Sequence, residues 1–295
     1  MDIKQLSFLI ALDETRHFGQ AAVRCHVTQP TLSMRLRNLE EELGLTLVNR
    51  GQRFEGFTPE GERILAWARS LLAAHDGLRA EAAACQGQLV GTLRLGLVPL
   101  AGVDPMHLLA RFRQAHPGLQ FHLHTLSSEQ IFDQLARNQL DLGLCYLEHP
   151  DPAQFDWLPL PETRMGLLHD RRHFRLEQIE LDWSELETLP LGLLTSGMHF
   201  RQSIDHDLRS RGVRLRPVLE VDSVHPLLQA VAAGLCCAVV PLDAGLESFS
   251  TEARLLPITG AGTLSRPGLV MRRQVPQSAL AKACFESARE LLESD

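Results

Sequence analysis

The sequence predicts an α/β protein that follows an all-α N-terminal domain, with a long helix between the two. Three observations predict this arrangement: two short amphipathic helices within residues 18–43, heptad spacing within residues 59–87, and strands alternating with helices after residue 91. The chain has 295 residues, 44% of them hydrophobic, so it can form about two domains with ordinary cores.

The first two helices form a helix-turn-helix pattern. One face of the first helix is small and apolar, and the second helix carries a leucine stripe; these positions are Phe18, Ala21, Ala22 and Cys25, then Leu32, Leu36, Leu39 and Leu43. Thr28 is placed to cap the second helix, Pro30 fits its first turn, and Gly44 fits its C-terminal stop. The end from Thr28 to Arg35 is therefore free to enter a DNA groove.

Two apolar runs around a basic turn follow within residues 45–61, as expected of a two-stranded wing. We expect the DNA-binding residues to be Thr28, Gln29, Pro30, Thr31, Ser33, Met34, Arg35, Arg37, Arg50 and Arg53. The alternative is an all-α domain that does not contact nucleic acid, because amphipathic helix pairs are also common in such domains.

The charge of the chain is unusual for a DNA-binding protein, since the formal net charge is −7. Residues 1–60 hold seven basic and eight acidic residues, so this segment is not basic either. Arg35, Arg37, Arg50 and Arg53 lie on the second helix and the wing, whereas Glu40 to Glu42 lie at the far end of that helix. We therefore expect a local positive potential.

The segment 59–87 predicts one long helix. Its apolar positions alternate spacings of four and three, typical of a coiled-coil interface, at Ile64, Ala68, Leu71, His75, Leu78, Ala82 and Cys85. We expect this helix to pair with its copy in a second chain and so to form a dimer. Two DNA-reading helices would then be held at a fixed separation, which predicts a DNA site with two-fold symmetry. The alternative is a helix that packs on its own domain.

After residue 91, short strands alternate with helices, which is typical of a parallel α/β fold. Open parallel sheets bind ligands at the carboxyl ends of their strands, so the polar and loop residues there are candidates for binding a small-molecule ligand. They are Pro99, Leu100, Ala101, Thr125, Ser127, Thr195, Ser196, His199 and Arg201. His199 and Arg201 favour an anion such as a carboxylate. Ser127 with Gln130 also fits a capping box, and Thr195 or Ser196 also fits a helix N-cap.

No metal site or cofactor is expected. His122 and His124 share one strand face but lack an evident third ligand, and the six cysteines show no CxxC spacing. Cys25 and the pair Cys236 and Cys237 lie in apolar patterns typical of core residues. Cys85, Cys145 and Cys284 leave redox sensing open as an alternative.

The N-terminal segment resembles the winged helix-turn-helix of the LysR-type transcriptional regulators. The matching residues are Phe18, Ala21, Ala22, Gln29, Pro30, Ser33, Leu39, Glu40, Leu43, Gly44, Leu47, Arg50, Thr58 and Gly61, with weaker matches at Gly91, 141–143 and 230–241. Val48, Asn49 and the Gly56-Phe57 pair depart from the family pattern in the wing, and Leu100 stands where many relatives have Ser or Thr.

The resemblance implies a DNA-binding domain over 1–58 with its helix-turn-helix at 18–37, a linker helix over 59–88, and an effector-binding domain over 91–295. That domain is expected to have two subdomains of the periplasmic-binding-protein type: subdomain I over 91–161 and 267–295, and subdomain II over 162–266. The expected effector lies between them. The expected partners are promoter DNA, a small-molecule effector, further copies of the chain, and RNA polymerase.

The sequence shows neither an export leader nor a long apolar run, so we expect a cytoplasmic protein without a membrane partner. An enzyme is the first alternative class, but the sequence lacks GxSxG, GxxxxGK[ST], GxGxxG and HExxH. A solute-binding protein is the second, and the N-terminal helices argue against it.

Overall fold

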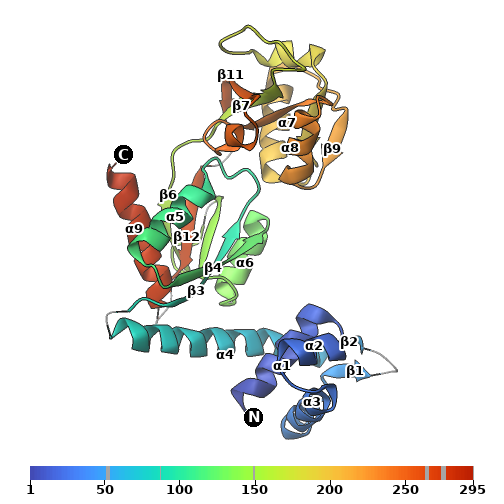
Figure 1. The fold of residues 1–295 in the computed structure, drawn as a ribbon, viewed down its shortest axis with the longest axis vertical. Helices are drawn as coiled ribbons and strands as arrows, with labels where there is room; N and C mark the ends of the chain where they lie inside the picture. The colour runs from blue at the N-terminus through green and yellow to red at the C-terminus, as the bar shows by residue number, and fades with distance from the viewer. Residues whose placement is uncertain (51–53, 87, 149, 263–265, 274–276, 295) are drawn as a thin grey trace. The chain divides into compact units, whose positions relative to one another are not determined.

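The computed structural model describes residues 1–50, 54–86, 88–148, 150–262, 266–273 and 277–294. Figure 1 shows the chain coloured along its length. It forms two compact units: Met1–Gln88 with Ala136–Gln139, and Leu89–Leu135 with Leu140–Asp295.

The first unit begins with three helices: α1 (Ile3–Thr15), α2 (Phe18–Arg24) and α3 (Gln29–Leu43). The Thr28 hydroxyl accepts a hydrogen bond from the backbone N–H of Thr31, and Gly44 ends α3 with a left-handed φ of 67°. Both ends of the helix therefore form as the sequence predicts. The core contains the predicted faces of α2 and α3, including Ala21, Ala22, Leu32, Leu36 and Leu39.

The wing and the long helix complete this unit. Strands β1 (Val48–Arg50) and β2 (Phe54–Phe57) pair antiparallel with an irregularity after Asn49, and α4 spans Pro59–Ala84. Gly61 lies in the first turn of α4, and a Cβ added there would be 2.1 Å from the carbonyl oxygen of Leu47. Only glycine permits this close approach between helix and wing.

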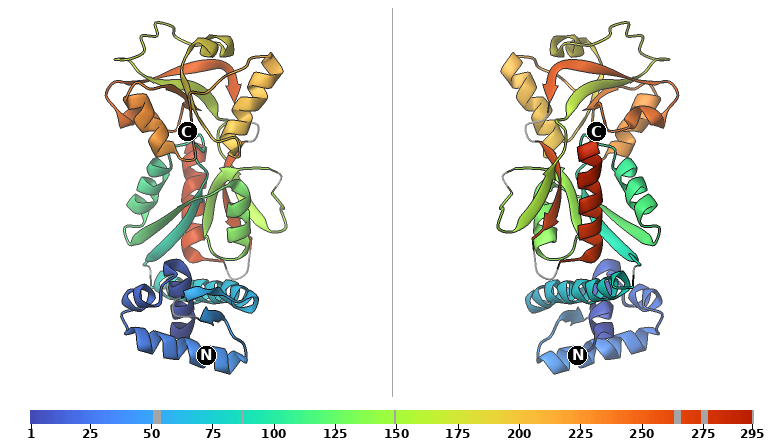
Figure 2. Two further views of the ribbon diagram at one scale, coloured as in Figure 1. Left: turned by 90° about the vertical axis from the view of Figure 1, so that its right-hand side faces the viewer. Right: turned by 90° about the vertical axis from the view of Figure 1, so that its left-hand side faces the viewer.

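Subdomain I is a five-stranded mixed sheet in the order β4-β3-β5-β12-β6, with three helices. The elements are β3 (Gly91–Leu97), α5 (Pro105–Ala115), β4 (Leu119–Thr125), α6 (Ser128–Ala136), β5 (Leu142–Tyr146), β6 (Phe155–Pro159), β12 (Pro267–Arg272) and α9 (Ala279–Ser294). β3 runs parallel to β4 and β5, whereas β12 runs antiparallel to β5 and β6. Figure 2 shows α9 and α6 on opposite faces of this sheet.

Subdomain II has a second mixed sheet, in the order β11-β7-β10-β8-β9. Its elements are β7 (Arg164–Asp170), β8 (Leu191–Leu194), α7 (His199–Arg211), β9 (Leu219–Val221), α8 (Val224–Ala232), β10 (Cys237–Pro241), β11 (Ala253–Gly262) and 3-10 turns at Trp183–Thr188 and Leu246–Phe249. The predicted α/β order with two subdomains is present, and both sheets are mixed rather than parallel throughout. The chain passes between the subdomains twice, from β6 to β7 and from β11 to β12. Each of these four strands pairs antiparallel with its neighbours.

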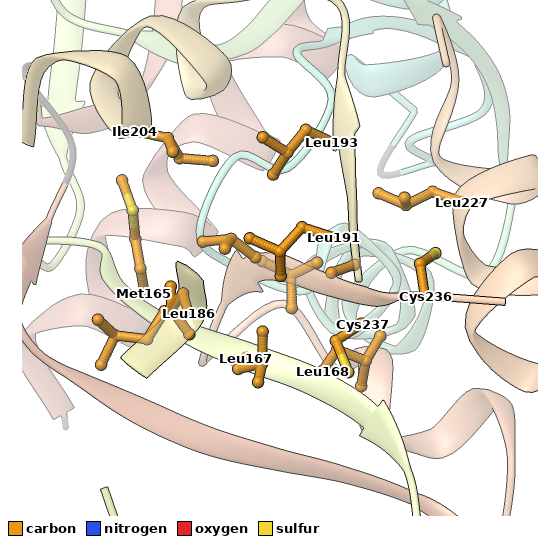
Figure 3. Close-up of a cluster of buried hydrophobic side chains, with 14 of the residues drawn as sticks. Met165, Leu167, Leu168, Leu186, Leu191, Leu193, Ile204, Leu227, Cys236 and Cys237 are labelled. Carbon is orange, nitrogen blue, oxygen red and sulfur yellow. The ribbon is translucent and has the colours of Figure 1, made fainter. Parts of the chain in front are cut away.

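The core of subdomain II joins its sheet to both of its helices. Figure 3 shows Leu167 and Leu191 from the sheet packed with Ile204 of α7 and Leu227 of α8. Cys236 and Cys237 lie in the same cluster, as the sequence predicts for core thiols. Within the described part of the chain, no helix has both the length and the apolar character needed to cross a membrane.

Candidate DNA-binding helix and effector site

The N-terminal half of α3 presents polar side chains to solvent. Thr28, Gln29, Pro30, Arg35 and Arg37 are exposed, and Thr31 and Ser33 are half-buried. Met34 is 54% exposed, which is unusual for a large apolar side chain. The leucine stripe on the opposite side of α3 is buried, so its polar face is available to a ligand.

Neighbouring residues hold the cationic part of α3 in place. The guanidinium of Arg35 lies 3.4 Å from the carboxylate of Asp2, while the amide of Gln5 donates to the backbone carbonyl of Arg35. This ion pair is exposed and contributes little energy, so Arg35 can exchange Asp2 for a phosphate.

Glu40 does not add free negative charge at the end of α3. Its carboxylate accepts hydrogen bonds from the backbone N–H groups of Leu47 and Val48 at 2.8 and 3.1 Å. The sequence placed Glu40 in an acidic cluster and among the residues that match the LysR-type pattern, but it did not indicate these hydrogen bonds. The structure gives it a role in fixing the start of the wing.

Of the two arginines predicted in the wing, the structure describes the backbone pairing of only one. Arg50 pairs with Phe54 in the β1–β2 ladder, and Arg53 lies outside the described residues. A cation that the sequence analysis did not single out supports this strand pair: the guanidinium of Arg16 lies 5.8 Å from the Phe54 ring and 5.6 Å from the Phe57 ring.

The long helix α4 has an exposed apolar face. This face begins at Trp67, whereas the predicted heptad series begins at Ile64. Ala68 is buried and Ile64 is half-buried in the core of the first unit, as the alternative interpretation of this helix requires. Leu71 and Leu78 are exposed, and Trp67, which the heptad series omitted, is 70% exposed. Trp67, Leu71, Ala74 and Leu78 keep spacings of four, three and four.

The loop after β3 connects subdomain I to the core of subdomain II. Leu100 adopts a left-handed backbone conformation with φ of 57°, is only 7% exposed, and belongs to the hydrophobic cluster of subdomain II. Ala101 is buried and Pro99 is half-buried. A non-glycine residue in this conformation is strained, so the packing of its side chain and the contacts of its backbone must maintain it.

One such contact comes from Tyr146, the only tyrosine in the sequence. Its hydroxyl donates to the carbonyl oxygen of Leu100 at 2.7 Å, and its ring stacks on His199 with 4.0 Å between centroids. The Nδ1 atom of His199 lies 2.6 Å from the carboxylate of Glu148. We call Leu100, Tyr146, Glu148, Thr163 and His199 the junction residues.

Sequence reasoning missed three of the junction residues. Tyr146 is the last residue of β5, Glu148 follows it, and Thr163 precedes β7. Applying the strand-end rule to β5 would have identified Tyr146 and Glu148. Thr163 had no comparable signal, because its role depends on contact with the loop around Gly102.

The other predicted effector residues have varied surroundings. Thr125, Ser127 and Ser196 are exposed, and Thr195 is half-buried. Ser127 and Gln130 exchange side-chain to backbone hydrogen bonds, which is the capping box that the sequence left open. Met198 is the N-cap residue of α7, so neither Thr195 nor Ser196 has that role.

Arg201 is engaged by its own subdomain. Its guanidinium contacts Asp205 at 2.9 Å, Glu220 at 2.6 Å and the carbonyl oxygen of Leu194 at 2.8 Å. Two carboxylates already balance its charge. The geometry therefore gives no support to an effector anion bound by this guanidinium.

The thiols of the second unit are poorly suited to redox chemistry. Cys145, Cys236, Cys237 and Cys284 are buried, and burial raises the pKa of Cys145, Cys237 and Cys284 to about 12. Such thiols carry almost no thiolate, which is the reactive form. Cys85 is exposed. His122 and His124 are exposed on β4, and within the described ranges no three His, Cys, Asp or Glu residues cluster as metal ligands would.

Comparisons with known proteins agree with this geometry. A family model described as a bacterial regulatory helix-turn-helix protein, lysR family, matches residues 3–62, and one described as a LysR substrate binding domain matches residues 86–293. The Escherichia coli (strain K12) DNA-binding transcriptional dual regulator OxyR is 38% identical over 169 residues, which cover 57% of this chain and 55% of that protein. The regulator EstR of Acinetobacter baylyi is 40% identical over 141 residues, covering 48% and 47%.

The chain thus spans about half the length of the curated relatives that it matches. Among solved structures, a full-length OxyR variant from Pseudomonas aeruginosa has a TM-score of 0.69 at 25% identity, covering 98% of this chain and 95% of that one. The LysR family regulator CbnR has a TM-score of 0.76 at 20% identity, covering 99% of both chains, and shows the shared fold. The chain belongs to the LysR family of bacterial regulatory helix-turn-helix proteins, and its larger part matches the substrate binding domain of that family.

Proposed function

We propose that the N-terminal half of α3 reads a promoter sequence and that the wing and nearby arginines hold the DNA backbone. The observation that carries this proposal is the run of exposed polar side chains on a helix end fixed by Thr28 and Gly44. Gln29 is suited to adenine, while Pro30, Thr31 and Met34 are suited to a thymine methyl group. Ser33 and Arg35 contact base edges or phosphates, and Arg37, Arg50 and Arg53 contact phosphates.

The exposed face of α4 supports assembly of two chains. Trp67, Leu71 and Leu78 are large apolar side chains on one helix, and they follow coiled-coil spacing. We infer that α4 pairs with its copy in a second chain, giving a dimer or a tetramer. Two reading helices would then bind two half-sites of a symmetric operator, so a monomeric fragment would bind weakly.

The effector is proposed to bind between subdomains I and II, next to the junction residues and the loop Pro99 to Ala101. Thr125, Ser127, Thr195 and Ser196 lie at or after strand ends and remain candidates for its periphery. We propose that the effector shifts the arrangement of the subdomains and so changes promoter binding. We further propose that the regulator acts on RNA polymerase, in the cytoplasm.

Several relatives are called hydrogen peroxide-inducible genes activators. We do not extend a thiol-based peroxide response to this chain, because its thiols in the second unit are buried and their pKa values are raised. An effector bound without covalent chemistry fits these residues better.

Electrophoretic mobility shift with the DNA upstream of the chain's own gene tests the reading helix. We expect Gln29→Ala to lower the preference for that DNA over a scrambled fragment by about tenfold, the size of one base contact. Arg37→Ala should weaken binding to both fragments alike and reduce the slope of log affinity against log salt by about 1. Arg79→Ala, an exposed arginine on α4, is the matched control. Equal binding of wild type to both fragments would refute the proposal.

A further inference from the structure

Four buried side-chain polar atoms in subdomain II lack hydrogen-bond partners among the described residues, on Thr163, His169, Trp183 and His199. Two of them, Nε2 of His199 and the hydroxyl oxygen of Thr163, belong to junction residues. Thr163 is 2% exposed and lies against the loop that carries Leu100, since a Cβ added at Gly102 would be 2.0 Å from its hydroxyl. His199 stacks on Tyr146, which bonds the same loop. Leaving a buried polar atom without a hydrogen-bond partner is costly, so two of them beside one loop point to a missing ligand.

Glu148 determines which hydrogen-bonding role remains open on His199. A carboxylate only accepts hydrogen bonds, so the 2.6 Å contact requires a proton on Nδ1 of His199. A neutral imidazole with this proton presents a lone pair at Nε2, which is an acceptor. Burial lowers the pKa of His199, and Glu148 only partly opposes this shift, so the neutral form is favoured. His199 is also the first residue of α7, where the helix dipole disfavours a cation.

The charges around this position disfavour an anionic ligand. Glu148 places a carboxylate on the far side of the imidazole ring. Arg201 is occupied by Asp205 and Glu220, and Arg164, next to Thr163, is exposed and lies 3.8 Å from Asp243. An anion would meet the carboxylate of Glu148 without gaining an uncommitted guanidinium.

We propose that His199 is the specificity-determining residue of the effector site: its Nε2 accepts a hydrogen bond from an uncharged effector that carries an amide or hydroxyl donor. Thr163 supplies a second hydrogen-bonding group, and Glu148 is a positioning residue that fixes the tautomer of His199. The inference rests on the proposed effector site between the subdomains. Both unpartnered atoms are covered in this structure, so a ligand reaches them when the junction opens.

The test uses the full-length chain and pairs of ligands that differ in charge but not in shape. Ligand-observed saturation-transfer NMR measures the dissociation constants of benzamide against benzoate, and of acetamide against acetate. His199→Phe keeps a ring to stack on Tyr146 but removes both nitrogens. His206→Phe, at an exposed histidine on the same helix, is the matched control. Thermal unfolding confirms that each variant is folded.

We expect the amides to bind wild type and His206→Phe equally, and to bind His199→Phe at least fivefold more weakly. Glu148→Gln removes the charge and lets Nδ1 accept a hydrogen bond, so it should shift the benzoate-to-benzamide preference at least fivefold toward benzoate. The proposal is overturned if wild type binds the carboxylates as well as the amides, if His199→Phe binds benzamide like wild type, or if neither amide binds. Mobility shift on the same samples reports separately on DNA binding.

Discussion

On α3 the polar side chains face solvent along a single helix. At the junction, Tyr146 and Thr163 are buried, His199 is half-buried and Glu148 is exposed, and each of them contacts another segment of the chain. Gln29, Arg35 and Arg37 come from one helix and lie within nine positions of one another. Leu100, Tyr146 and His199 come from three separate segments and contact one another through a stacked ring pair and one hydrogen bond.

This contrast fits the different ligands that we propose for the two regions. DNA approaches from outside, so a surface helix can bind it with side chains left exposed. A small molecule must be enclosed, so the effector site that we propose combines several segments. Strain at Leu100 and unpartnered atoms at His199 and Thr163 are features that such a site would have to tolerate. Substitutions should therefore act locally in the first unit but affect contacts between two subdomains at the junction.

The largest expected effect is at Gly61, where α4 meets the wing. Gly61→Ala places a Cβ 2.1 Å from the carbonyl oxygen of Leu47, and a backbone atom there has little room to move. We expect a loss of about 3 kcal/mol in the unfolding free energy of residues 1–88, at the upper end of the usual range for overpacking. Hydrogen-exchange mass spectrometry can measure it on peptides from α1 to α4.

Gly77→Ala is the matched control, since Gly77 lies on the same helix with nothing within 4 Å of its added Cβ. It should stabilise α4 by about 1 kcal/mol through helix propensity. Equal effects of the two substitutions would contradict the close approach of helix and wing.

The second effect is at Leu100, which tests whether the junction depends on packing into subdomain II. Leu100→Ala should cost about 2–3 kcal/mol in the stability of that subdomain, because it leaves a cavity in the hydrophobic cluster. Leu123→Ala, at an exposed leucine on β4, should be nearly neutral. Hydrogen exchange in β7 and β10 is the measurement.

A third substitution at the same position isolates the backbone strain. Leu100→Gly should be no less stable than Leu100→Ala, although glycine is usually the more destabilising, because it adopts a φ of 57° freely. If the glycine variant were clearly less stable than the alanine variant, Leu100 would not be strained.

A smaller effect is expected at His26, in the turn before α3. His26 has φ of 54° and an exposed side chain, so His26→Gly should stabilise the first unit by about 0.5–1 kcal/mol. Arg16 has a similar φ of 51°, but it pairs with Asp13 and contacts Phe54 and Phe57. Arg16→Gly should therefore be destabilising, and chemical denaturation of the two variants compares them directly.

The smallest effect concerns pH and the junction. Burial lowers the pKa of His199 and His169 below the ordinary value of 6.5, so the unfolded chain binds more protons than the folded chain just below that pH. The unfolding free energy of the second unit should fall as pH decreases below 6.5. His199→Phe should reduce this slope, as measured by denaturation at several pH values. An unchanged slope would mean that His199 titrates alike in both states.

The sequence predicted the first unit more completely than the second. Apolar spacing and end-capping residues located α2, α3 and α4 within a few residues, because those signals act over one or two helical turns. The direction of β12 was not predictable in this way, since it depends on the chain returning from subdomain II.

The same limit applies to the junction. His199 was identified from its position after β8, but its partners Tyr146 and Glu148 are about fifty positions earlier in the sequence. Arg201 was interpreted as an anion-binding cation. Asp205 lies four residues later on the same helix, so spacing could have identified that ion pair, whereas Glu220 comes from β9. The contacts made by Glu220, Tyr146 and Glu148 depend on the tertiary fold, which spacing alone does not specify.

The central claim is that paired α3 helices of this regulator read a specific promoter sequence. Hydroxyl-radical footprinting of the full-length chain on the DNA upstream of its own gene tests it most directly. We expect two protected half-sites related by two-fold symmetry and separated by a whole number of DNA turns, with protection lost in Gln29→Ala and kept in Arg79→Ala. Uniform protection, or an identical footprint in Gln29→Ala, would contradict the claim.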